Sequence, residues 1–179
     1  MAALPYPKHL EVRAVLAELG PVLVRPVKPE DEPAYYAAFA RMTPEDLHMR
    51  FFGPMPDLPE DIARRLTNID YDREMAFVML RQPEGDLVGV SRMIMTKADR
   101  AEFAVIVRSD LKGHGIGRYL MKCLVDYARS RAVRELYGDI LRENVPMAEF
   151  MRELGFHLEP IPESEAIIRA TLQLAPKAA

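Results

Sequence analysis

The stretch VIVRSDLKGHGIGRYLM, residues 105–121, decides the fold. It continues an apolar run that begins at Phe103, and such a run is typical of a buried strand. A polar turn, residues 108–112, follows the strand, and an apolar periodicity of helical spacing begins near residue 116. Between turn and helix, three glycines stand at alternate positions: Gly113, Gly115 and Gly117.

Glycines in this arrangement predict a site for an anion. They allow a positive φ and leave the backbone N–H groups uncovered by side chains. At the start of a helix those N–H groups have no intrahelical partner, and the helix dipole adds partial positive charge. The loop therefore predicts a cradle for phosphate or pyrophosphate. It is not a dinucleotide fingerprint, because Arg118 stands where that pattern needs glycine, and the P-loop pattern is absent. A merely structural tight turn is the alternative.

The composition is that of an ordinary globular domain. Of 179 residues, 49% are hydrophobic and 28% charged, with a formal net charge of −3. This charge argues against general nucleic-acid binding, and no apolar run is long enough for a membrane helix. The N-terminus lacks the pattern of a signal peptide, and Cys123 is the single cysteine. We therefore expect a cytoplasmic protein with no membrane or nucleic-acid partner and no disulfide.

Proline and glycine residues mark the predicted boundaries between elements in the N-terminal third of the chain. Residues 1–20 are expected to be an appendage or linker with a short helix over residues 10–19, and residues 21–176 a single domain. A strand is predicted over residues 22–27. Helices are predicted to begin at Pro29, after Thr43 as N-cap, and at Pro59.

From residue 75 the pattern changes to strands. Residues 75–82 and 87–96 read as a hairpin, followed by the strand before the glycine loop. A helix over residues 115–131, a strand over 136–141, a helix over 146–154 and a strand over 166–174 complete the chain. This order predicts an α/β (α+β) domain with a mixed sheet flanked by helices. The helix after the glycine loop must cross between two strands, which places the ligand at the carboxyl end of the first.

Two segments resemble the GNAT acetyltransferase superfamily. KGHGIG, residues 112–117, is similar to its acyl-CoA pyrophosphate loop, and ENVPMAEFMRELGF, residues 143–156, is similar to its second signature. The resemblance covers residues 22–174 and implies a mixed, mostly antiparallel sheet, an acyl-CoA-dependent N-acetyltransferase activity and acetyl-CoA as co-substrate. Residues 24–52 and 5–11 resemble, more narrowly, the acetyltransferase domain of bacterial protein lysine acetyltransferases, which is often fused to an acyl-CoA synthetase-like region.

The resemblance assigns a set of cofactor-binding positions. Backbone groups of Ile106 and Val107 would form hydrogen bonds with the pantetheine amides. A backbone N–H near Val105 would donate to the thioester oxygen. Asn144 would contact the pantetheine arm or act only as a helix N-cap. Lys112 departs from the usual glutamine or arginine, but backbone N–H groups carry most of the pyrophosphate contact. The predicted set is Val105, Ile106, Val107, Lys112, Gly113, His114, Gly115, Ile116, Gly117, Arg118 and Asn144.

Glu102 is the predicted general base. An amine nucleophile must lose its proton, which for a lysine of pKa about 10.4 costs roughly 4.6 kcal/mol at pH 7. A carboxylate in the mostly apolar strand AEFAVIV is expected to have a raised pKa and to act through a water, as a glutamate at this position does in the family. The alternative candidates for the base are Asp70, Asp72 and Glu74. On this sequence the alternative that Glu102 faces solvent at the strand end and has no catalytic role also stays open.

The general acid is unassigned by the sequence. Where many family members carry a tyrosine, seven residues after the asparagine, this chain has Met151. A thiol of pKa near 8.5 is a fair leaving group, so solvent can supply the proton. Cys123 is expected in the core, and the histidines show no metal-ligand spacing, so no metal is predicted.

Three functions stay open at this point. The first is acetyl transfer to a protein lysine, with an acyl-CoA synthetase as one candidate partner. The second is transfer to a small amine. The third is a non-catalytic acyl-CoA sensor. Acyl-chain preference and oligomeric state are not determined by the sequence.

Overall fold

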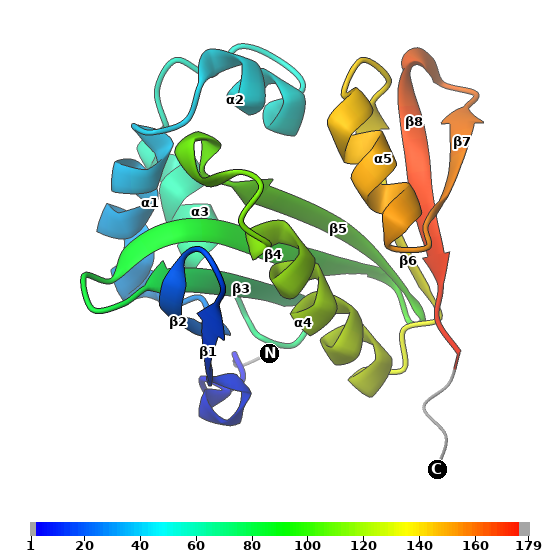
Figure 1. Ribbon diagram of the computed structural model, residues 1–179. Coiled ribbons are helices and arrows are strands. Elements are labelled where there is room, and N and C mark those ends of the chain that lie inside the picture. Colours follow the sequence, from blue (N-terminus) through cyan, green and yellow to red (C-terminus); the bar gives the residue numbers. More distant parts are fainter. Residues whose placement is uncertain (1–2, 176–179) are drawn as a thin grey trace.

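The computed structural model describes residues 3–175. Its centre is one sheet of eight strands in the order β1-β2-β3-β4-β5-β6-β8-β7 (Figure 1). All neighbouring strands are antiparallel except β5 and β6. The strands are β1 (Val12–Leu16), β2 (Gly20–Pro26), β3 (Glu74–Arg81), β4 (Asp86–Lys97), β5 (Arg100–Val107), β6 (Glu135–Leu141), β7 (His157–Ile161) and β8 (Ser164–Gln173).

Helices cover both faces of the sheet. The α-helices are α1 (Glu32–Phe39), α2 (Pro44–Phe51), α3 (Glu60–Thr67), α4 (Ile116–Ser130) and α5 (Val145–Glu153), with short 3-10 turns η1 (Lys8–Leu10), η2 (Pro29–Asp31) and η3 (Ser109–Leu111). Strand β3 shows the two layers, because Met75, Phe77 and Met79 pack with α4 while Ala76 and Val78 pack with α1 and α3. Burial on both faces explains why this strand is a continuous apolar run. The predicted α/β (α+β) fold, a mixed and mostly antiparallel sheet flanked by helices, is confirmed.

One prediction of secondary structure is wrong, and one strand was not predicted. Residues 10–19 do not form a helix, because Val12–Leu16 is strand β1 and pairs with β2 from Val12 opposite Val24 to Leu16 opposite Gly20. The ladder hydrogen bonds of that pairing are tertiary, and they override the weak local helix pattern. Strand β7 was not predicted, since His157–Ile161 contains a proline and lies at the sheet edge with few buried side chains.

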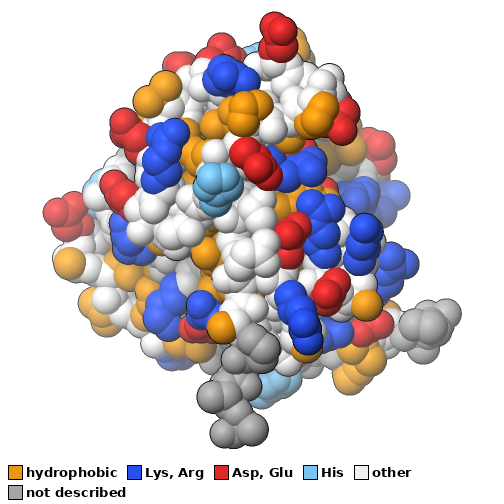
Figure 2. Space-filling model, turned by 90° about the vertical axis from the view of Figure 1, so that its right-hand side faces the viewer, with side chains coloured by type: hydrophobic (Ala, Val, Ile, Leu, Met, Phe, Trp, Pro, Cys, Tyr) orange, Lys and Arg blue, Asp and Glu red, His pale blue; other side chains and the backbone are white. Residues whose placement is uncertain are grey.

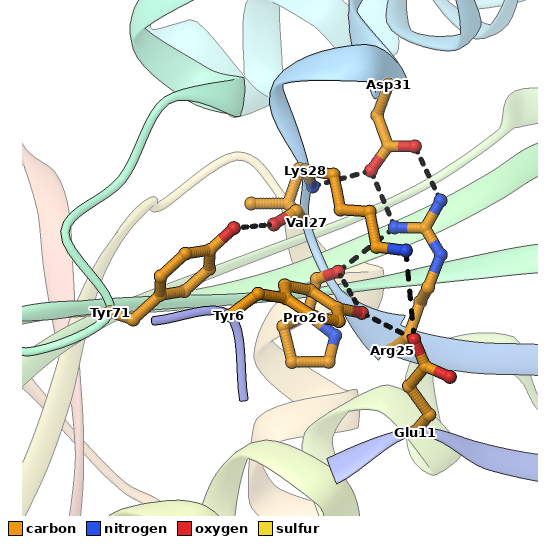
Figure 3. A network of polar contacts seen from close by, with 8 residues as sticks. All are labelled: Tyr6, Glu11, Arg25, Pro26, Val27, Lys28, Asp31 and Tyr71. Carbon is orange, nitrogen blue, oxygen red and sulfur yellow. Dashed lines mark hydrogen bonds and ion pairs between the residues drawn. The ribbon is translucent and has the colours of Figure 1, made fainter. Parts of the chain in front are cut away.

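A polar network fastens the N-terminal segment to the sheet (Figure 3). The buried Arg25 guanidinium binds Asp31 through two hydrogen bonds of 2.6 and 2.8 Å. Tyr6 donates to Glu11, and its ring packs edge-on against Tyr71 with ring centroids 5.8 Å apart. Glu11 lies 3.8 Å from the Lys28 ammonium, and Tyr71 donates to the carbonyl of Val27 at 2.7 Å. Burial, together with the hydrogen bond to Glu11, raises the pKa of the Tyr6 hydroxyl. Residues before β2 therefore contact the main sheet, while the predicted boundary between residues 1–20 and 21–176 stays a prediction.

The parallel pair β5–β6 positions the functional site. The two strands pair only from Arg100 opposite Glu135 to Glu102 opposite Tyr137, and then they part. At this point β6 has Gly138, where a Cβ would lie 2.7 Å from the Phe103 ring and 2.9 Å from its carbonyl oxygen. Phe103 also packs on Phe156, with ring centroids 5.0 Å apart. Glycine thus permits a close approach of the two strands at the base of the gap, with an aromatic pair filling the space beside it.

We expect Gly138→Ala to destabilise the protein by about 1–3 kcal/mol, because the added methyl group meets backbone as well as the Phe103 ring. Urea unfolding monitored by circular dichroism measures this change. Gly53→Ala is the matched control, since a Cβ there meets no atom within 4 Å. Equal unfolding midpoints for the two variants would contradict the close-packing role of Gly138.

Candidate active site

A cavity of about 710 Å³ lies where β5 and β6 part. One wall is β5 from Glu102 to Val107, and the opposite wall comes from the start of α5 and from β6. The glycine loop closes one end, and α2 covers the side (Figure 1). The fold therefore brings the predicted strand, loop and second signature to one cavity.

The glycine loop has the geometry of an anion cradle. Gly113 and Gly115 have φ values of 82° and 79°, and Gly115 is the N-cap of α4. A Cβ at either position would meet no neighbour within 4 Å, so it is the positive φ that favours glycine here, and the space above the backbone is open. Within the described residues 3–175, the amide N–H groups of residues 113–118 donate no backbone hydrogen bond. These amides are available to an anion at the N-terminus of a 15-residue helix.

The open edge of β5 offers further backbone groups. Pairing with β6 ends at Glu102, so among the described strands residues 103–107 pair with β4 alone. Val105, Ile106 and Val107 all line the cavity. A ligand with amide groups can pair with this edge as an additional strand, which is how extended peptides bind open sheet edges.

Glu102 lies at the cavity wall with an exposed side chain. Its alternation with Ala104 and Ile106 places it on the side of β5 that faces α2 and α3. The apolar surroundings expected from the strand sequence are therefore absent at Glu102 itself, because it is the solvent-facing member of the strand.

The three alternative bases are engaged elsewhere. The Glu74 carboxylate pairs with Arg92 at 2.6 Å, and Asp72 pairs with Arg131 at 3.0 Å. Asp70 accepts hydrogen bonds from backbone N–H groups that follow it. None of the three lines the cavity, so geometry favours Glu102.

The second signature, residues 143–156, contains the N-cap and the whole of α5. The Asn144 side chain accepts a hydrogen bond from the Met147 N–H at 3.3 Å, and it also lines the cavity. Met151 is fully buried in the core beneath the helix. Among the described residues, the cavity lining contains no tyrosine, so no phenol is placed to act as general acid.

The charged side chains of the loop already have protein partners. Lys112 binds the Asp46 carboxylate of α2, and Arg118 binds Glu153 of α5 at 2.8 Å. His114 does not line the cavity, because its Nδ1 lies 2.9 Å from the Leu111 carbonyl and must donate to it. Backbone groups are thus the more available ligands of the loop, while Lys112 and Arg118 border it.

Sequence reasoning predicted helix α2 but not its place at the site. Thr43 caps the helix by accepting from the Asp46 N–H, as predicted. Asp46 also accepts from Ser109 at 2.5 Å, which ties α2 to the glycine loop. At the other side, His48 lies 3.0 Å from Glu143. These long-range contacts have no local sequence signal, because their partners lie more than 60 residues away.

The electrostatics of Asp46 follow from these contacts. Partial burial acts to raise the pKa of this carboxyl, but hydrogen bonds from Lys112, Ser109 and Thr43 outweigh burial and lower the pKa. Asp46 is therefore ionised at neutral pH, and it holds the Lys112 ammonium at the edge of the cradle.

These features fit an acyl-CoA. Free amides at a helix N-terminus match a pyrophosphate, and the open β5 edge matches the amides of a pantetheine arm. The fit rests on the uncovered loop backbone and on the interrupted β5–β6 ladder.

Comparisons with known proteins agree with this site. Residues 22–157 match the family model of the acetyltransferase (GNAT) domain, and the chain belongs to this family. An acetyltransferase of Pseudomonas aeruginosa is 32% identical over 156 residues, which cover 84% of each chain. The crystal structure of the GNAT domain of S. lividans PAT superimposes with a TM-score of 0.87 at 23% identity, covering 95% of this chain and 100% of that one. A ribosomal alpha-N-protein acetyltransferase in complex with coenzyme A superimposes with a TM-score of 0.73 at 13% identity, covering 91% and 98%.

The chain is accordingly an acyl-CoA-dependent N-acetyltransferase that transfers acetyl groups to amines. Within residues 3–175, no helix is long and apolar enough to cross a membrane. Viewed from the side of β7 and β8, acidic and basic side chains are interspersed over the surface (Figure 2). The predictions of no metal and of a cytoplasmic location stay predictions.

Proposed function

We propose that this chain transfers an acetyl group from acetyl-CoA to the side-chain amine of a protein lysine, with Glu102 as general base. The observation that carries the proposal is the position of Glu102, exposed on the wall of the cavity beside the open β5 edge. An exposed base is accessible to an amine on a large partner, whereas a small-amine enzyme commonly encloses its acceptor. Likeness to the S. lividans PAT domain supports a protein acceptor, and an acyl-CoA synthetase stays the candidate partner.

The bound co-substrate would supply a thioester, whose carbonyl carbon is open to attack by an amine. The amides of residues 113–118 would hold its pyrophosphate, and the β5 edge from Val105 to Val107 would hold its extended arm. Asn144 both caps α5 and lies at the cavity, so it can contact the same arm. A backbone N–H near Val105 would donate to the carbonyl oxygen as negative charge develops there.

Glu102 takes the proton that the attacking amine must lose, either directly or through one water. The new C–N bond forms as the C–S bond breaks, and the departing thiolate takes a proton from solvent. Solvent is the donor we assign, because no tyrosine among the described residues lines the cavity. The Met151 position predicted from the signature lies in the core and has no part in the step.

An acceptor competition tests the proposal. The protein is mixed with labelled acetyl-CoA, an acyl-CoA synthetase, a bulk protein extract, polyamines and amino acids. We expect the label on protein lysines, and mass spectrometry of peptides and small molecules measures its distribution. Label confined to small amines would contradict the lysine acceptor. Tight acetyl-CoA binding with no labelled product would contradict catalysis and favour the sensor function.

A further inference from the structure

Arg50, at the end of α2, lines the cavity and has no hydrogen-bonding or ionic partner among the described residues. Its recorded contact is a cation–π contact with the ring of Phe51, whose centroid lies 4.9 Å from the guanidinium carbon. It lines the main cavity together with Glu102. It also lines a smaller, mostly apolar cavity of about 70 Å³ next to Ala104 and Ile106.

The other charges around Arg50 do not neutralise it. Its neighbour Arg92 is already satisfied, by Glu74 at 2.6 Å and by the Leu66 carbonyl at 2.8 Å. Burial and repulsion from Arg92 lower the pKa of Arg50 to about 10, while Tyr35 and Glu102 act in the opposite direction. Arg50 is therefore still charged at neutral pH, and Glu102 lies beyond ion-pair distance.

The unpaired donors of Arg50 are open to the cavity. In the described part of the chain, no fully buried side-chain nitrogen or oxygen lacks a partner, so the guanidinium of Arg50 is reached by solvent. A partly desolvated guanidinium is a strong site for a planar anion, because its donors match a carboxylate in a bidentate arrangement. Its place beside Glu102 puts that anion near the reacting groups.

We propose that Arg50 binds a carboxylate carried by the substrate beside the transfer centre. This inference rests on the proposed function and adds a substrate class to it. Two sources share the chemistry: the far end of a dicarboxylic acyl group, such as succinyl, and an acidic side chain next to the acceptor lysine. The small cavity lined by Leu47, Phe51 and Ile106 lies beside Arg50 and suits the methylene groups of a short acyl chain.

Binding measurements test the acyl source without any need for turnover. Titration calorimetry compares the Kd of succinyl-CoA with that of acetyl-CoA for the unmodified protein, for Arg50→Met and for Arg50→Lys. A carboxylate on the acyl group predicts that the unmodified protein prefers succinyl-CoA by about 10- to 100-fold, that Arg50→Met loses this preference, and that Arg50→Lys keeps part of it. Arg64→Met is the matched control, because Arg64 is an exposed arginine that pairs with Glu60 on α3.

Peptide kinetics test the acceptor source. Lysine peptides with a glutamate or a glutamine neighbour are compared by kcat/KM with acetyl-CoA, again in the unmodified protein and in Arg50→Met. The proposal is supported if either experiment shows a preference for the charged ligand that is lost in Arg50→Met and kept in Arg64→Met. The experiment that shows this preference identifies whether the carboxylate belongs to the acyl group or to the acceptor. Equal affinity and equal kcat/KM for charged and neutral ligands in the unmodified protein would overturn it, whatever the folding of the variants. Acetyl-CoA that neither binds nor reacts would instead overturn the proposed function.

Discussion

Glu102→Gln is expected to lower kcat by about 100- to 10,000-fold while the Kd for acetyl-CoA stays within about twofold. Glutamine keeps the size and the hydrogen-bonding oxygen of the side chain but does not accept the proton of the attacking amine. The binding contacts are unaffected, because the glycine loop and the β5 edge act through their backbone. Steady-state kinetics with a lysine acceptor and calorimetry with acetyl-CoA measure the two quantities separately.

Glu163→Gln is the matched control for this prediction, since Glu163 is an exposed glutamate in the turn between β7 and β8. It removes the same charge away from the cavity lining and is expected to leave kcat unchanged. Near-normal turnover of Glu102→Gln would refute the role of Glu102 as base. Equal losses in both variants would show that overall charge, rather than proton transfer, governs the rate.

Gly115→Val is expected to weaken acetyl-CoA binding by about 100-fold or more, because two or more charge-assisted hydrogen bonds are lost. Gly115 has a φ of 79°, and a β-branched residue there strains the backbone and covers the amides of the cradle. The measurement is the Kd for acetyl-CoA, by calorimetry, at a temperature where the variant is folded.

Gly85→Val separates strain from binding. Gly85 has nearly the same φ, 82°, and equally open surroundings, but it lies in the turn between β3 and β4. Both variants pay a left-handed backbone cost of about 1–2 kcal/mol. Only Gly115→Val should lose affinity, and an equal loss in Gly85→Val would refute a specific cradle at the glycine loop.

Local patterns predicted most elements because the determinants are local. The N-cap at Thr43, the glycine loop before α4 and the proline-led turn of α5 each depend on residues a few positions apart. Strands β1 and β7 were not predicted, because their determinants are not local. Their identity comes from ladder bonds to β2 and β8, and their own side chains are mostly exposed.

The candidate site divides in the same way. The structure brings most of the predicted site residues to one cavity. They include the predicted base Glu102 and the cofactor positions Gly113, Gly115, Val105–Val107 and Asn144. His114 lies outside the cavity lining, since its ring is bonded to the loop carbonyls. Asp46 and Arg50 were missed, because α2 reaches the cavity through contacts with residues about 60 positions or more away.

The sequence by itself determined the anion cradle and the family resemblance, since backbone conformation and helix termini follow from short-range residue choices. Only the tertiary structure decided that β5 and β6 part after Glu102 and that α2 lines the resulting cavity. It also decided that Arg50 lies there with no ionic partner among residues 3–175. Gly138 and Phe103, which approach closely at the base of the gap, are 35 positions apart in the sequence. Such contacts form only when the whole sheet is assembled, which is why the cofactor could be read from the chain while the surroundings of the acceptor could not.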